Sequence, residues 1–308
     1  MNHRSLADSA LTALAPAVWG STYLVTTEFL PADRPLLASV LRALPAGLIL
    51  LAIGRTLPRG IWWWRALVLG VLNIGAFFYL LFVAAYHLPG GVAALVMTIQ
   101  PMLVLLLGTL LLKDKIKGVH VTACVLGAAG VALLVLQPDA GLSTTGVIAG
   151  LLGAVSMALG IVLTKRWGRP EGVGLLTFTG WQLTVGGLVL VPVALIGEGL
   201  PRTLTGENLW GFAYLGIIGA LLAYALWFRG VERLPALAVS FLSFASPLAA
   251  TLLGWFVLDQ ALSPLQITGA LIVVAAVVLA QPRPARRTPA PPPAPARAGE
   301  QPREHAGA

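Results

Sequence analysis

Long apolar stretches without charged residues constrain this chain more than any other feature. The stretch from Gly90 to Leu112 contains no Asp, Glu, Lys or Arg, and an apolar helix of about 20 residues crosses the roughly 30 Å of bilayer hydrocarbon. Overall, 57% of the residues are hydrophobic and 10% are charged, whereas about 25% are charged in an ordinary soluble domain. The composition therefore indicates an all-α membrane protein, because the stretches are continuous and lack the alternation of barrel strands.

Charge and proline punctuation divides the chain into ten apolar segments, each predicted to be a transmembrane helix. Most of the connections between them are short and contain Pro or Gly. The first segment is interpreted as a retained helix, because its apolar run continues past any plausible signal cleavage point. The segments are Ala10–Thr27, Pro35–Ile53, Ala66–Ala85, Gly90–Leu112, Val119–Leu136, Gly146–Leu163, Gly174–Ile196, Leu209–Phe228, Ala236–Leu258 and Pro264–Ala280.

The basic residues are sorted by loop. If the N-terminus is cytoplasmic, every Lys and Arg except Arg34, Arg42 and Arg202 falls on the cytoplasmic side, as the positive-inside rule requires. The sorting predicts that both termini are cytoplasmic and supports an even number of helices. The net charge of +8 is therefore explained by topology, and no nucleic-acid partner is expected.

A pattern of prolines occurs twice in the chain at one constant spacing. Leu88-Pro89 is matched by Leu234-Pro235, Pro101 by Pro247, and the Leu-Leu-Gly ending at Gly108 by the one ending at Gly254. Since five helices end on the side opposite to where they began, a second copy must be inserted upside down. The sequence predicts two inverted five-helix repeats, residues 1–140 and 141–281, followed by a disordered cytoplasmic tail rich in Pro, Ala and Arg, residues 282–308.

Several kinds of chemistry are disfavoured by what the segments lack. Cys124 is the single cysteine and the four histidines are scattered, so neither a disulfide nor a metal or other cofactor is expected. No Asp or Glu lies near the middle of a segment, which disfavours a proton-coupled cation antiporter, with Glu28 as the best remaining carboxylate. No serine has an evident acid or base partner at membrane depth, so an enzyme is not expected.

Arg42 is the one ionisable residue well inside a predicted span. An arginine there costs about 2.5 to 3.5 kcal/mol on the insertion scale, so it should face a partner or a wet cavity. It could bind a substrate carboxylate through two parallel hydrogen bonds. Alternatively, it could snorkel to the headgroups or bond helix-end carbonyls.

Polar, aromatic and proline residues mark the faces that could line a cavity. Trp19 and Tyr23 share one helix face, and the prolines at 101 and 247 free backbone carbonyls, which are tolerated at membrane depth beside a cavity. Ordinary helix packing explains any one of these residues equally well. The predicted substrate-binding residues are Trp19, Tyr23, Arg42, Asn73, Phe78, Tyr79, Gln100, Pro101, Tyr224, Ser243, Ser246 and Pro247.

Several stretches together resemble the EamA branch of the drug/metabolite transporter superfamily. They are "PAVWGSTYLV" in the first segment, Arg42, "LPGGVAALVMTIQPMLVLLLGTLLLKDK" and, in the second half, "LPALAVSFLSFASPLAATLLGWFVLDQALSPLQITGALIVVAAVVLA". Trp19, Gly20, Ser21, Arg42, Pro101 and Pro247 match the family's pattern. The usual Gly-Glu pair is replaced by Lys113-Asp114 and Asp259-Gln260, and Met157 replaces the tryptophan expected in the sixth segment.

The resemblance implies a ten-helix transporter of the bacterial inner membrane, with a cavity between its halves. It would export amino acids, including aromatic ones, or similar small amphipathic metabolites, as a monomer whose partners are its small-molecule substrate and membrane lipid. Two alternatives from other classes stay open. One is a lipid-linked carrier or flippase, and the other is an accessory membrane subunit that transports nothing itself.

Overall fold

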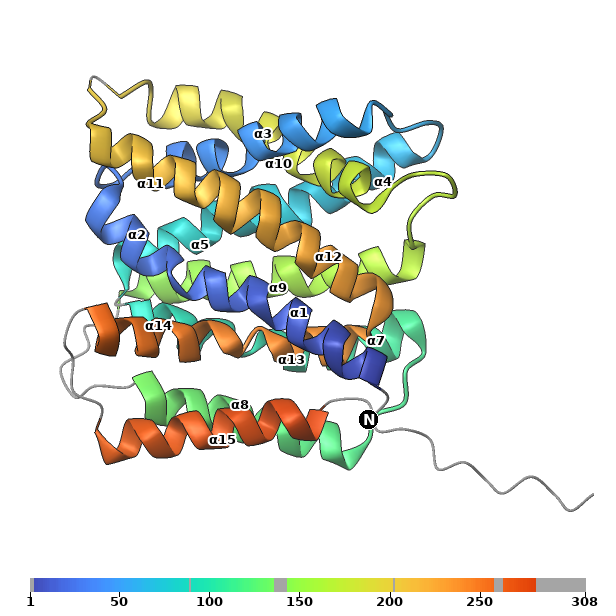
Figure 1. Ribbon diagram of the computed structural model, residues 1–308, viewed down its shortest axis with the longest axis vertical. Coiled ribbons are helices and arrows are strands. Elements are labelled where there is room, and N and C mark those ends of the chain that lie inside the picture. Colours follow the sequence, from blue (N-terminus) through green and yellow to red (C-terminus); the bar gives the residue numbers. More distant parts are fainter. Residues whose placement is uncertain (1–2, 89, 136–142, 202, 258–262, 281–308) are drawn as a thin grey trace, which may run out of the picture.

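The computed structural model describes residues 3–88, 90–135, 143–201, 203–257 and 263–280, and within these ranges the regular structure is entirely helical (Figure 1). Seven helical stretches there are long and apolar enough to cross a membrane, and Gly118–Leu133 and Pro264–Ala280 are shorter apolar helices. The elements are α1 (His3–Gly20), α2 (Thr22–Phe29), α3 (Pro35–Gly54), α4 (Trp62–Gly70), η1 (Val71–Gly75), α5 (Ala76–His87), α6 (Gly90–Met97), α7 (Gln100–Leu112), α8 (Gly118–Val135), α9 (Thr144–Trp167), α10 (Leu175–Gly197), α11 (Gly206–Gly216), η2 (Ile217–Leu222), α12 (Ala223–Arg233), α13 (Ala236–Leu242), α14 (Ala245–Val257) and α15 (Pro264–Ala280).

Three predicted helices are broken: the segment Ala10–Thr27 divides into α1 and α2 at Ser21, and two others divide shortly before a proline of the doubled pattern. The segment Gly90–Leu112 divides into α6 and α7, and Ala236–Leu258 divides into α13 and α14. Each of these two breaks lies a few residues before a proline of the doubled pattern, Pro101 or Pro247. Proline has no N–H and its ring clashes with the carbonyl four residues earlier, so the preceding turn cannot continue as a regular α-helix.

Two other helices contain a π-helical turn. The π segment η1 joins α4 to α5, and η2 joins α11 to α12. The two π segments begin at Val71 and Ile217, and these residues are separated by the same number of positions as the matched prolines, Pro101 and Pro247. In a π turn the hydrogen bonds skip one residue further than in an α-helix, which locally disturbs the ladder and often marks a functional site.

Close packing of glycines brings α3 and α10 together in opposite directions. A methyl group on Gly47 would lie 2.4 Å from the backbone nitrogen of Thr184, and one on Gly187 would lie 2.7 Å from the Cβ atom of Leu44. The contact on α10 thus moves from Thr184 to Gly187 as the contact on α3 moves back from Gly47 to Leu44. The two helices are therefore antiparallel. Figure 1 shows α8 and α15 side by side at the other end of the molecule, where the two helices also pack together.

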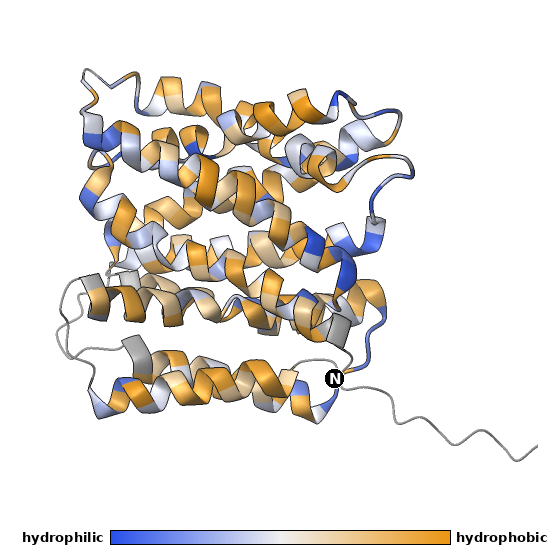
Figure 2. Ribbon diagram, in the orientation of Figure 1, coloured by the Kyte–Doolittle hydropathy of each residue, from blue (hydrophilic) through white to orange (hydrophobic). Residues whose placement is uncertain are grey.

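The polar connections gather at the two ends of the helices, as Figure 2 shows. The loops that follow α3, α7, α9 and α12 lie at the same end as the N-terminus (Figure 1). At that end, Asp8 forms ion pairs with Arg229 at 2.6 Å and Arg233 at 3.4 Å. Lys165 donates hydrogen bonds to three carbonyls at the end of α12, at 2.9 to 3.0 Å. These contacts join the N-terminal helix and α9 to the C-terminal end of α12.

Candidate functional site

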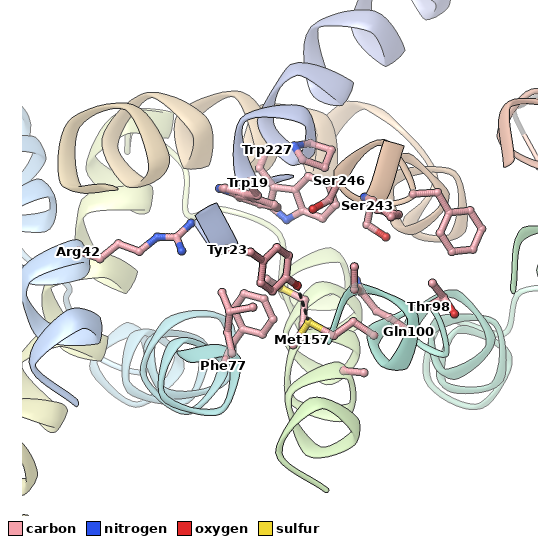
Figure 3. Close-up of a pocket in the computed structure, with 17 residues that line it drawn as sticks. Trp19, Tyr23, Arg42, Phe77, Thr98, Gln100, Met157, Trp227, Ser243 and Ser246 are labelled. Carbon is pink, nitrogen blue, oxygen red and sulfur yellow. Dashed lines mark hydrogen bonds between the residues drawn. The ribbon is translucent and has the colours of Figure 1, made fainter. Parts of the chain in front are cut away.

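A buried cavity lies where the broken helices α6/α7 and α13/α14 approach α1, α5 and α9 (Figure 3). Its volume is about 60 Å³, and roughly 10 to 15 Å³ measured in the same way is enough for one water molecule. Helices from both halves of the chain supply its walls. The predicted site residues that the structure brings together here are Trp19, Tyr23, Arg42, Gln100, Ser243, Ser246 and Pro247.

Arg42 on α3 is the charged group of this cavity. Its side chain is 1% exposed, and in Figure 3 its guanidinium end points toward Trp19 and Tyr23. It donates one hydrogen bond from Nη2 to the carbonyl oxygen of Gly219, at 3.2 Å. Its Nε and Nη1 atoms have no hydrogen-bond partner within the described part of the chain. This burial excludes the alternative that Arg42 snorkels to the lipid headgroups.

The π turn η2 provides the acceptor that orients Arg42. The carbonyl oxygen of Gly219, inside η2, also accepts a hydrogen bond from Nε1 of Trp19 at 2.9 Å. Two donors from different helices, α1 and α3, therefore converge on one carbonyl of η2. The guanidinium lies in ordinary contact with this backbone, its Nη2 atom 3.7 Å from where a Cβ atom on Gly219 would be.

Aromatic rings line part of the cavity, among them Trp19 and Trp227, and the rings of Tyr224 and Phe78 lie close by, outside the lining. The ring centroids of Trp19 and Trp227 are 5.1 Å apart, and those of Trp19 and Tyr224 are 4.9 Å apart. The guanidinium carbon of Arg42 lies 4.5 Å from the ring centroid of Phe78, within the range of a cation–π interaction. Trp227 Nε1 and the Tyr224 hydroxyl are buried without a hydrogen-bond partner in the described structure.

The two helix breaks supply further polar groups to the cavity. Thr98 and Gln100 come from the α6/α7 break, and Ser243 and Ser246 from the α13/α14 break. The hydroxyls of Thr98 and Ser243 are bonded to carbonyls of their own helices, at 2.7 and 2.5 Å. The amide nitrogen of Gln100, in contrast, has no partner among the described residues.

Five of the predicted residues do not line the cavity. Asn73 is fully buried in η1, where its Nδ2 donates to Thr164 Oγ1 at 3.1 Å and to Gln182 Oε1 at 2.7 Å. Pro101, Phe78 and Tyr224 are buried outside the lining. Tyr79 is 37% exposed, so it points away from the interior.

Sequence reasoning omitted several lining residues from the predicted site. Phe77 lines the cavity where the neighbouring Phe78 was predicted, and Trp227 lines it one helical turn beyond Tyr224. Both were visible as aromatic residues of the correct helices, but the helix rotation was not. Met157, at the position of the family's tryptophan, also contributes to the wall, as do Pro16, Leu81, Ala94, Met97, Thr98, Ala154 and Phe244.

A larger hollow of about 570 Å³ lies nearer the helix ends, between α7, α8, α13 and α15. Lys115, Lys117, Asp114 and His120 contribute to its lining. These residues belong to the α7–α8 connection and the first turn of α8, and not to the centre of the spans. The central cavity is therefore the candidate site, because it combines a buried cation with walls from both halves of the chain.

Apolar helices packed around a partly polar cavity are the architecture of a multi-pass membrane protein with a solute-sized site between its spans. The sequence profile of the EamA-like transporter family matches residues 9–136 and again 144–280, and the chain belongs to this family. It is 52% identical over 267 residues to Protein PecM of Dickeya dadantii (strain 3937), covering 87% of this chain and 90% of that protein. The predicted resemblance to the EamA branch is thus confirmed.

Other relatives have the same extent. The chain is 28% identical over 270 residues to the uncharacterized inner membrane transporter YedA of Escherichia coli (strain K12), covering 85% of this chain and 86% of YedA. A solved crystal structure of a protein that is 22% identical has a TM-score of 0.73, over 89% of this chain and 97% of that one. This second likeness shows that the fold is shared.

Proposed function

We propose that the protein is a secondary transporter that exports small amphipathic metabolites, amino acids among them and aromatic ones in particular, by alternating access. The observation that carries this proposal is the central cavity, which is buried between the two halves of the chain and combines aromatic rings with hydrogen-bond donors. A solute bound there contacts both halves. A rocking motion of one half against the other would expose it first to one side of the membrane and then to the other.

The two halves are proposed to be inverted five-helix repeats, giving ten transmembrane helices. Four observations support this arrangement. The family profile matches twice in succession, the π turns η1 and η2 occur at the spacing of the proline patterns, and each half has one broken helix before a matched proline. The second long helices of the halves, α3 and α10, pack in opposite directions, as inverted copies would around a pseudo-twofold axis.

The membrane orientation follows from the loops. The basic connections after α3, α7 and α9, and the C-terminal end of α12 with Arg229 and Arg233, share one end of the molecule with the N-terminus (Figure 1). The positive-inside rule assigns that end to the cytoplasm, and we place both termini there, in the inner membrane of a bacterium. The predicted tail, residues 282–308, lies outside the described residues. The transporter is proposed to act as a monomer in membrane lipid, without a cofactor.

The gates of the cycle are proposed to lie at the helix breaks. Turns before Pro101 and Pro247 interrupt the α-helical hydrogen bonding at the level of the cavity. The helices can therefore bend at these positions while losing few further backbone hydrogen bonds. Gly20 at the end of α1 touches α14 closely, since a methyl group there would lie 2.5 Å from the carbonyl oxygen of Ser246. Movement of α14 would therefore displace α1 directly, including Trp19, which precedes Gly20.

Comparing the medium of cells with and without the gene tests this proposal most broadly. Exported metabolites should be depleted from the medium of the deletion strain and should accumulate inside its cells. The purified protein in liposomes should move the same compounds down a gradient. An accessory subunit would move none of these compounds in liposomes, and a flippase would move a lipid instead. Either result would contradict the proposal and support the corresponding alternative.

A further inference from the structure

The central cavity contains more unpaired hydrogen-bond donors than acceptors. The free N–H groups are Nε and Nη1 of Arg42, Nε1 of Trp227 and Nε2 of Gln100. All three residues line the cavity. A buried polar group without a partner is unfavourable, and a buried charge without one more so. The cavity is therefore incomplete without an occupant that supplies acceptor atoms.

The charge of the cavity is also unbalanced. Among the described residues that line it, Arg42 carries the only charge, and neither Asp nor Glu contributes to the wall. The guanidinium has no ion-pair partner within the described part of the chain. It is held by one neutral carbonyl, that of Gly219, and by the face of Phe78. An anion would provide the missing counter-charge, whereas a cation would be repelled.

A comparison between the halves shows that the contact corresponding to the Arg42–Gly219 hydrogen bond involves no charged group. In the second half, Arg42 bonds to the π turn η2 at Gly219. In the first half, the π turn η1 is met by a neutral amide, because Gln182 accepts from Asn73. Asn73 and Gly219 are matched by the constant spacing of the repeats. Of the two side chains that meet the two π turns, Arg42 is therefore a cation and Gln182 is uncharged.

The aromatic wall sets the other requirement. Trp19, Tyr23 and Trp227 present ring surfaces beside the guanidinium (Figure 3). Rings attract a flat apolar body through stacking and burial of apolar surface. We propose that the substrate is an organic monoanion whose carboxylate, or a comparable group, binds Nε and Nη1 of Arg42 while a flat apolar body packs against these rings. This inference rests on the proposed transport function and names the class of its substrate.

Three compounds with the same ring and two-carbon spacer test this proposal by varying the charged groups that the spacer carries. They are 3-phenylpropionate, an anion; phenylalanine, a zwitterion; and phenethylamine, a cation. Binding to the purified full chain in detergent is measured by isothermal titration calorimetry and by the shift of the thermal unfolding midpoint. We expect the anion to bind about tenfold more tightly than the zwitterion or better: both compounds carry the carboxylate, but the ammonium of the zwitterion would be buried beside Arg42 with no counter-charge in the described lining. We expect the cation not to shift the midpoint.

A pair of variants links the preference to one side chain. Arg42→Met should abolish the preference for the anion, and Arg59→Met, at an exposed loop position, should preserve it. Equal binding of anion and cation to the unaltered protein, a measurement that requires no variant, would overturn the inference. So would an unchanged preference in a folded Arg42→Met protein. If none of the compounds binds, this substrate class is wrong, while export of other metabolites is decided separately by the comparison of media.

Discussion

Replacing Arg42 by methionine should change stability and transport in opposite directions. Methionine has a similar length and fills irregular apolar space, but it has no charge. The substitution removes a charged hydrogen bond of 3.2 Å to Gly219, which contributes about 1.5 to 3 kcal/mol. It also removes the cation–π contact with Phe78 at 4.5 Å, which contributes about 0.5 to 2 kcal/mol.

The opposing effect is the burial of an arginine that has no anion beside it. Its side chain is 1% exposed, and the penalty for a buried ion is several kcal/mol even after relaxation. The free energy of unfolding of Arg42→Met should therefore equal or exceed that of the unaltered protein, by about 0 to 3 kcal/mol. Transport of an anionic substrate should fall about tenfold or more, because the charge that attracts it is lost.

Thermal unfolding in detergent and efflux from proteoliposomes measure the two quantities on the same preparation. Arg59→Met is the matched control, because that arginine is exposed in a loop and should affect neither quantity. A lower unfolding midpoint for Arg42→Met combined with normal efflux would refute the reasoning. It would show that Arg42 acts as a structural link between α3 and η2 and not as a substrate-binding group.

Three further predictions concern packing, capping and charge movement. Gly20→Ala should lower the free energy of unfolding by about 1 to 3 kcal/mol, because the added methyl group would overpack α1 against Ser246. The control Gly206→Ala should not lower it, since a methyl group there would meet no atom within 4 Å. Equal thermal unfolding midpoints of the two variants would contradict the close approach. Glu198→Gln should cost about 1 kcal/mol, because Glu198 accepts two backbone N–H groups, at 2.6 and 2.9 Å, at the start of α3; an unfolding midpoint equal to the original would argue against this cap. An inside-negative potential, set with valinomycin and a potassium gradient, should accelerate 3-phenylpropionate efflux. Moving one elementary charge across 100 mV changes the free energy by about 2.3 kcal/mol. An unchanged efflux rate would contradict movement of a net negative charge.

The sequence predicted the helices well where hydrophobicity alone determines them. An apolar run bounded by charge has few alternatives in a membrane, so most predicted segments lie within observed helices or overlap them closely. Arg42 was identifiable for the complementary reason, because a lone charge within an apolar span must be accommodated by a specific environment. The prolines at 101 and 247 likewise indicated disturbed helices, and the structure has breaks a few residues before them.

Helix rotation and the π turns could not be predicted in the same way. Adjacent residues of a helix point about 100° apart, so the sequence could not say that Phe77 lines the cavity while Tyr79 faces outward. The π turns contain no proline, and η2 depends on contacts of Gly219 with Trp19 and Arg42 from distant helices. Asn73 was assigned to the cavity because it is polar within a span, but tertiary packing directs its amide nitrogen to Thr164 and Gln182 instead.

Counterflow in proteoliposomes tests the central claim, alternating access through the cavity between the two halves, most directly. Vesicles containing the purified protein are loaded with unlabelled 3-phenylpropionate or phenylalanine and diluted into a trace of the labelled compound. A carrier that exposes one site alternately should accumulate the label transiently above its equilibrium level, and Arg42→Met should reduce that accumulation for the anion. No transient accumulation of either compound with the unaltered protein would contradict the account.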